Sequence, residues 1–163
     1  MIELRKSPKF PNVSSRSVVK LCSYVLKQLG LEKCSLSVSL VDDAEMTRLN
    51  IKYFKKNKTT DVISFPMEED IRNGILLGDV VVCVAQAQRA AKENNLSVSE
   101  ELSLYLIHGI LHLTGERDGS AGEYRKMERK QNQLLKSVRE QGLLAKVKGF
   151  CLKSSREKFT LRT

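Results

Sequence analysis

Residues 106–118 contain both histidines of the chain, and this stretch limits the possible folds most strongly. His108 and His112 lie four residues apart in an apolar run, so on a helix their side chains project from one face, one turn apart. Gly115 can leave helical geometry, and a carboxylate, Asp118, follows three residues later. Two imidazoles on a helix and a third ligand returned by a turn can hold zinc with one coordination position open. The stretch therefore predicts a helix whose two histidines either hold a metal ion or pack in the core.

The residue after the first histidine separates two kinds of metal chemistry. In zinc proteases with two histidines at this spacing, that residue is a glutamate that acts as general base. Here the position is occupied by Gly109. A peptidase of related fold would keep its ligands and lose its base, so a peptidase remains a less favoured alternative.

Apolar spacing and turn residues predict helices and strands mixed along the chain. Alternation of serine with apolar residues indicates a half-buried strand at 34–41, and further strands are expected at 2–4, 59–66 and 80–84. Helical spacing with suitable caps predicts helices at about 15–29, 43–53, 85–94 and 121–140, and a further helix that is capped by Ser97 or Ser99 and carries the two histidines. The last helix should pack through Tyr124, Met127, Leu134, Leu135 and Val138.

Strict strand–helix–strand alternation is absent, so the expected class is α+β. We predict a single domain in which a small mixed β-sheet packs with helices around a central helix that carries the two histidines, an arrangement of zincin type. The domain is expected to span residues 1–141. Residues 142–163 would form a basic C-terminal extension that docks weakly or moves freely.

The position of the charge indicates a polyanionic partner. The formal net charge is +9, and residues 125–163 hold twelve Lys and Arg against three Asp and Glu, so the whole excess lies there. Nucleic acid is favoured over a membrane because no amphipathic aromatic face accompanies this charge. The absence of a signal pattern, of a long apolar run and of CxxC pairs leads us to expect a reduced, cytoplasmic protein.

The sequence of the histidine stretch, HGILHLTG followed by a possible ligand at position 118, resembles the HGxLHLxGxxH signature of the YbeY family of single-strand-specific metallo-endoribonucleases. Upstream matches agree in order and spacing over roughly residues 2–140. They are Leu49-Asn50 with Tyr53, the segment TDVISFP at 60–66, and Leu77-Gly78-Asp79.

This resemblance implies a zinc-dependent hydrolase, with the ion held by His108, His112 and Asp118. It also implies single-stranded RNA and ribosomal RNA as substrates, a role in 3′-end maturation of small-subunit (16S) rRNA and in ribosome quality control, and the small ribosomal subunit as a partner. The alternative from another class is a metal-stabilised RNA- or ribosome-binding module with weak catalysis.

Two positions depart from the family pattern. The third ligand of the family is a histidine, and Asp118 stands in its place. Aspartate also binds zinc, but its charge reduces the net charge of the site and makes Mn²⁺ more competitive.

The family has an arginine after Tyr53, where this chain has Phe54; we expect Lys55, Lys56 and Lys58 to contact phosphates instead.

The remaining polar candidates leave the general base open. Ser64 is assigned to substrate binding, with packing in its strand as the alternative, and Asp61 belongs to the same motif. Asp79 is interpreted as a turn residue or a residue that supports the ligands, and Glu116 and Glu123 as surface carboxylates. Whether water or the ribose 2′-hydroxyl attacks also stays open.

Overall fold

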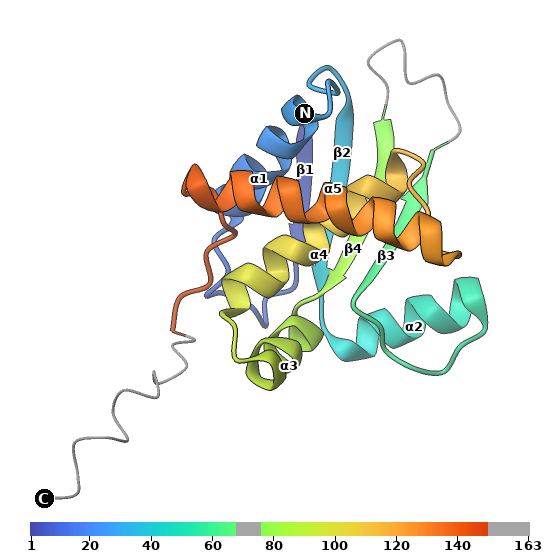
Figure 1. The fold of residues 1–163 in the computed structure, drawn as a ribbon. Coiled ribbons are helices and arrows are strands. Elements are labelled where there is room, and N and C mark those ends of the chain that lie inside the picture. The colour runs from blue at the N-terminus through green and yellow to red at the C-terminus, as the bar shows by residue number, and fades with distance from the viewer. Residues whose placement is uncertain (68–75, 150–163) are drawn as a thin grey trace, which may run out of the picture.

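The computed structural model describes residues 1–67 and 76–149, in which helices surround a four-stranded mixed sheet (Figure 1). The strands are β1 (Ile2–Lys6), β2 (Ser35–Val41), β3 (Val62–Pro66) and β4 (Leu76–Cys83). The helices are α1 (Ser15–Gln28), α2 (Asp43–Phe54), α3 (Val84–Asn94), α4 (Val98–Leu113) and α5 (Ala121–Glu140). The predicted α+β class is confirmed.

The sheet has the order β1-β2-β4-β3, with β1, β2 and β4 parallel and β3 antiparallel to β4. β1 lies at one edge of the sheet. β3 forms the other edge, where Pro66 pairs with Gly78 at the end of the ladder. A proline is tolerated there because an edge strand has one side without ladder partners.

The alternation of β2 separates the two faces of the sheet. Leu36, Val38 and Leu40 are buried in the main core, whereas the serines between them face the opposite side. That opposite side is covered in part by α2, whose Met46 packs with Val81 of β4 in a second, smaller cluster. The main core and its helices therefore occupy one face.

Helix α4 lies at the centre of the molecule. It contacts both β3 and β4, and α1, α3 and α5 pack around it; Figure 1 shows α5 crossing over α4 on the side away from the sheet. A helix enclosed in this way is apolar on several faces rather than on one stripe. Its first turn is capped by Ser97, whose side chain accepts a hydrogen bond from the Glu100 N–H at 3.0 Å. Ser97 is thus the cap of the histidine-bearing helix.

Several expected boundaries and contacts were wrong. β3 begins at Val62 rather than at residue 59, and β4 begins at Leu76 rather than at residue 80. Asp79 therefore lies inside a strand and not in a turn. On α5, Met127 and Val138 are buried as expected, but Tyr124 is 52% exposed because it lies in the first turn, beyond the main core.

The described chain continues beyond α5 along the N-terminal segment. Val147 forms a β-bridge with Val13, and Ala145 is fully buried with its N–H donating to Ser103 Oγ at 2.9 Å. The first residues of the predicted extension thus contact the domain; residues 150–163 lie outside the described residues. Within the described ranges, no helix combines the length and the apolar character needed to span a membrane.

Candidate metal centre

The side chains of His108 and His112 project from the same face of α4 and lie next to each other, as their spacing predicts. Their ring centroids lie 4.6 Å apart with the planes nearly perpendicular, and the two Nε2 atoms are separated by 3.0 Å. Each side chain keeps about a quarter of its surface exposed, 26% for His108 and 27% for His112. The buried helix thus presents two imidazole nitrogens to an accessible site.

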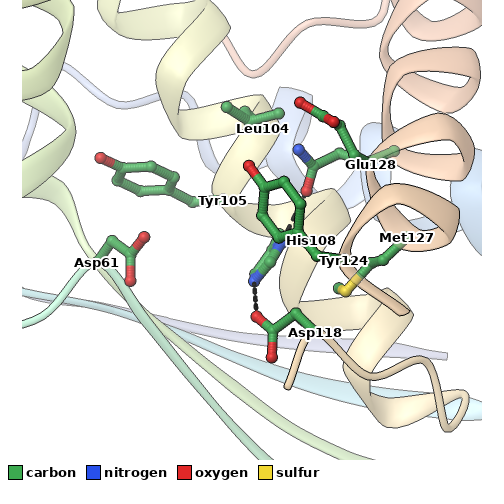
Figure 2. A pocket seen from close by; sticks show the side chains of 9 residues that line it. Asp61, Leu104, Tyr105, His108, Asp118, Tyr124, Met127 and Glu128 are labelled. Atoms are coloured by element: carbon green, nitrogen blue, oxygen red, sulfur yellow. Dashed lines mark hydrogen bonds and ion pairs between the residues drawn. The ribbon is translucent and has the colours of Figure 1, made fainter. Parts of the chain in front are cut away.

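The chain turns directly after α4 and brings Asp118 back to His108 (Figure 2). The turn passes through Gly115, whose φ of +93° is costly for a residue with a Cβ atom. Asp118 Oδ2 lies 3.4 Å from His112 Nε2 and 3.8 Å from His108 Nε2. The structure thus brings together the three residues that the sequence predicts as ligands.

Hydrogen bonds on the far side of each ring fix its tautomer. His112 Nδ1 lies 3.0 Å from the Glu116 carbonyl oxygen, which can only accept, so this nitrogen carries a proton. His108 Nδ1 lies 2.7 Å from Gln131 Oε1 on α5 and donates in the same way. With Nδ1 used in this way, the Nε2 atoms of both rings remain as the donors to a cation, and they face the same point.

The donor atoms fit a small divalent ion. The candidate donors of His108, His112 and Asp118 all lie within 4.8 Å of one another. Ligands about 2.1 Å from a tetrahedral ion would lie about 3.4 Å apart, which is close to the observed 3.0, 3.4 and 3.8 Å. Two imidazoles and one carboxylate suit zinc with a fourth position open, and they also accept manganese.

Gly109 is required by the way α4 packs on the sheet. A Cβ atom at this position would lie 2.5 Å from Val80 Cγ1 and 3.0 Å from Val62 Cγ2. The glutamate that zinc proteases carry after the first histidine has no room here. The sequence shows a glycine where zinc proteases have their general base. The packing of α4 on Val80 and Val62 explains why position 109 is a glycine.

A cleft of about 750 Å³ opens beside the three candidate ligands. Among the predicted substrate residues, Lys56 and Ser64 line this cleft, whereas Lys55 and Lys58 are exposed in the same loop without lining it. Ser64 Oγ donates to the Gly109 carbonyl at 2.8 Å, so its proton also ties β3 to α4. Arg117, which sequence reasoning did not select, lines the cleft as well.

A smaller cavity of about 190 Å³ lies on the α5 side of the ligands (Figure 2). Its wall includes Asp61, Tyr105 and Gln131 together with His108 and Asp118. Asp61 also lines the larger cleft, and its Oδ1 accepts hydrogen bonds from the Val62 N–H and the Thr60 hydroxyl. Asp61 thus both lines the site and caps the start of its strand.

The remaining acidic candidates are held in structural contacts. Lys130 forms an ion pair and hydrogen bond with Glu116 and holds the pKa of that carboxyl below its usual range. The Glu123 carboxylate accepts a hydrogen bond from the Ser120 N–H, and the Glu123 N–H donates one to Ser120 Oγ. The two bonds form the capping box of α5. Asp79 pairs with Ser37 and Phe65 and lines a groove that the candidate ligands do not line.

Gln131 is the contact that sequence reasoning missed most clearly. It lies 23 residues from His108, on another helix, and a glutamine on a polar helix carries no signal of its role. Asn50 was noticed only as part of a motif. It is 4% exposed, and its side-chain amide donates to the Lys58 carbonyl at 2.9 Å, which fixes the lysine-bearing loop.

Comparison with known proteins identifies related chains. A family model described as endoribonuclease YbeY matches residues 3–139. The chain is 39% identical over 126 residues to an endoribonuclease YbeY of Aquifex aeolicus, covering 77% of this chain and 81% of the relative. It is 33% identical over 148 residues to an endoribonuclease YbeY of Syntrophotalea carbinolica, covering 88% and 99%.

A solved structure supports the fold independently. The solution structure of a Thermotoga maritima protein matches 86% of this chain and 93% of its own, with a TM-score of 0.57 and 24% identity. At this level of identity the similarity concerns the fold.

Proposed function

The chain belongs to the endoribonuclease YbeY family, and from this we propose that it cleaves phosphodiester bonds of single-stranded RNA in a metal-dependent reaction. The observation that carries the proposal is the convergence of three donor atoms beside a cleft that a lysine and an arginine also line. The family gives the reaction class, and this convergence supports a location for the reaction at His108, His112 and Asp118.

The two histidines and Asp118 would hold the ion. The hydrogen bonds to Glu116 O and Gln131 Oε1 orient both imidazoles so that their Nε2 atoms face the site. A bound divalent ion supplies Lewis-acid chemistry, polarising a phosphoryl oxygen and acidifying water. We propose zinc as the resident ion and manganese as a competitor, because the carboxylate of Asp118 is a harder donor than imidazole.

The RNA backbone would be held by cations along the cleft. Lys56 and Arg117 line it, Lys55 and Lys58 add positive charge in the adjoining loop, and Ser64 offers its hydroxyl oxygen. Single strands are favoured because a flexible backbone can bend so that one phosphate approaches the histidines. A rigid duplex would have to present that phosphate without bending.

The cellular role follows from the family resemblance. We extend the proposal to 3′-end maturation of small-subunit ribosomal RNA, with the small ribosomal subunit as the partner and the cytoplasm as the location. Within the chain, the basic segment after residue 124 supports a polyanionic partner of this kind.

Two features favour a second candidate, a metal-stabilised RNA-binding module with weak catalysis. Asp118 replaces a neutral ligand by an anionic one, which weakens the Lewis acidity of a bound ion. Phe54 replaces a cationic side chain beside the cleft. A peptidase is disfavoured because the position of its general base is filled by packing around Gly109.

Cleavage of an end-labelled single-stranded RNA separates these candidates. The wild type should cut the RNA, lose activity with a chelator and regain it with added zinc or manganese, while His112→Ala stays inactive. Leu96→Ala, at an exposed site between α3 and α4, is the control and should match the wild type. RNA binding without cleavage would favour the binding module, and chelator-sensitive casein digestion would favour a peptidase.

A further inference from the structure

Aromatic side chains gather where α2 ends beside β3. The rings of Tyr53 and Phe65 have centroids 4.9 Å apart, and those of Phe54 and Phe65 lie 6.3 Å apart with planes only 22° from parallel. Tyr53 is 53% exposed and Phe54 is 47% exposed. Single exposed aromatic residues are common on protein surfaces, but a group of stacked aromatic rings indicates a surface that binds a ligand or a partner.

Phe54 connects this aromatic group to the candidate metal centre. It lines the same cleft as His108 and His112, whereas Tyr53 and Phe65 line the groove on the other side of β3. The ring that faces the cleft is thus backed by a second, nearly parallel ring. A planar ligand part that reaches the cleft can lie against it.

Positive charge surrounds the rings. Residues 46–60 contain no acidic residue and include Lys52, Lys55, Lys56 and Lys58. The Lys52 ammonium lies 5.2 Å from the centre of the Tyr53 ring, and Lys56 lines the cleft with Phe54. Aromatic rings between cations are the composition with which proteins bind unpaired nucleic acid, because bases stack on the rings while phosphates meet the cations.

The backbone holds this surface in place. Lys55 adopts a left-handed conformation with φ of +57° and ends α2, and its N–H donates to the Ile51 carbonyl at 3.1 Å. The buried Asn50 then holds the Lys58 carbonyl. The backbone that carries Phe54 and the lysines is therefore positioned before a ligand arrives, so less backbone entropy is lost on binding.

We propose that Phe54, backed by Phe65, is a stacking platform for one unpaired base of the RNA strand whose backbone passes Lys56 toward the histidines. The inference rests on the proposed function and adds how a single strand is recognised. A base in a duplex is already stacked and paired, so it cannot lie on Phe54. The contact is tolerant of base identity, because every base has a π-face.

A tryptophan reporter tests the stacking directly, since the chain contains no tryptophan. The emission of Phe54→Trp should be quenched by a decamer of deoxythymidine and not by an abasic decamer with the same number of phosphates. Leu96→Trp, at another exposed apolar position, is the matched control and should respond to neither. Equal responses of Phe54→Trp to both decamers would overturn the proposal.

Binding constants give a second, independent test. Phe54→Ala should weaken binding of the thymidine decamer about tenfold and leave the abasic decamer unchanged. Phe54→Arg should bind the thymidine and abasic decamers equally well. The slope of its log Kd against log salt concentration should increase by about 0.7, because one more phosphate is contacted. Leu96→Ala should retain both constants. Thermal unfolding checks that the variants fold, as expected for a half-exposed side chain.

The outcomes distinguish this inference from the proposed function. RNA cleavage by the wild type with no base preference at Phe54 would overturn the stacking platform alone. A preserved base preference without any RNA cleavage would overturn the proposed activity alone. If the Phe54→Trp emission changes with protein concentration in the absence of nucleic acid, and the base preference is absent, the surface contacts a second copy of the chain and the inference fails.

Discussion

The side-chain oxygen of Gln131 on α5 lies 2.7 Å from Nδ1 of His108 on α4. The contact joins the helix that bears the candidate ligands to the helix that covers it. It also leaves Nε2 of His108 as the atom that faces Asp118 and His112. The packing of α5 on α4 therefore orients the His108 ring within the candidate metal centre.

Removal of this contact should weaken metal binding without unfolding the protein. Gln131→Ala frees the His108 ring to rotate and to exchange tautomers, so metal affinity should fall about 10- to 100-fold. Gln131→Glu keeps an acceptor and should retain affinity. Gln133→Ala, an exposed neighbour on α5, is the control. Competition with a chromogenic chelator measures the affinity, and an unchanged value for Gln131→Ala would show that His108 is oriented by other contacts.

Addition of one methyl group at Gly109 should destabilise the fold. In Gly109→Ala the new Cβ meets Val80 Cγ1 at 2.5 Å, and overpacking of this kind costs about 1–3 kcal/mol. Gly122→Ala is the matched control, because a Cβ there has nothing within 4 Å and helix propensity should stabilise it by up to about 1 kcal/mol. Urea unfolding gives both free energies. A Gly109→Ala variant as stable as the wild type would mean that α4 can move away from the sheet at little cost.

Asp118 should contribute to metal binding as a ligand and set the preference for the ion. Asp118→Ala should bind zinc at clearly lower stoichiometry than the wild type after dialysis. Asp118→His offers three imidazoles and should favour zinc over manganese more strongly than the wild type does. Metal content by mass spectrometry decides the first point. Full zinc occupancy in Asp118→Ala would exclude the carboxylate as a ligand.

The ion pair between Asp43 and Arg89 should make stability depend on acid pH. Arg89 donates two hydrogen bonds of 2.7 Å to the Asp43 carboxylate and lowers its pKa from 3.8 to about 2. A carboxyl whose folded pKa is depressed adds stability above its unfolded pKa, and this stability is lost as pH falls from about 4 through 2. The side chain is 43% exposed, so solvent screening limits the gain to about 1 kcal/mol or less.

Comparison of Asp43→Asn with the wild type by urea unfolding measures this contribution. The variant should be less stable at pH 7, and the difference should vanish near pH 2. Glu3→Gln, which breaks a more exposed pair with Arg5, should change stability little at either pH. A difference for Asp43→Asn that persists unchanged at pH 2 would mean that its origin is not the charge.

The local parts of the site could be predicted because local sequence determines them. The spacing of His108 and His112 needs only helical geometry, and the return of Asp118 needs only a residue such as Gly115 that tolerates positive φ. Both predictions agree with the structure. The serine alternation of β2 likewise revealed a strand with one fully buried face.

Contacts between distant elements were not predictable in this way. Gln131 reaches His108 only because α5 crosses α4, and nothing within either helix specifies that crossing. Gly78 and Asp79 are typical turn residues, but β4 runs through them. A Cβ at Gly78 would lie 2.4 Å from the Phe65 carbonyl oxygen and 2.7 Å from Leu113 Cδ2, so the glycine serves close packing rather than a turn.

The most direct test of the account is the RNA cleavage rate of metal-free protein as zinc or manganese is added in measured equivalents. We expect no cleavage without metal, a linear rise, and a plateau at one ion per chain. His112→Ala should stay at the baseline at every ratio. Full cleavage by the metal-free wild type, or cleavage by His112→Ala that equals the wild type, would contradict a metal centre at His108, His112 and Asp118.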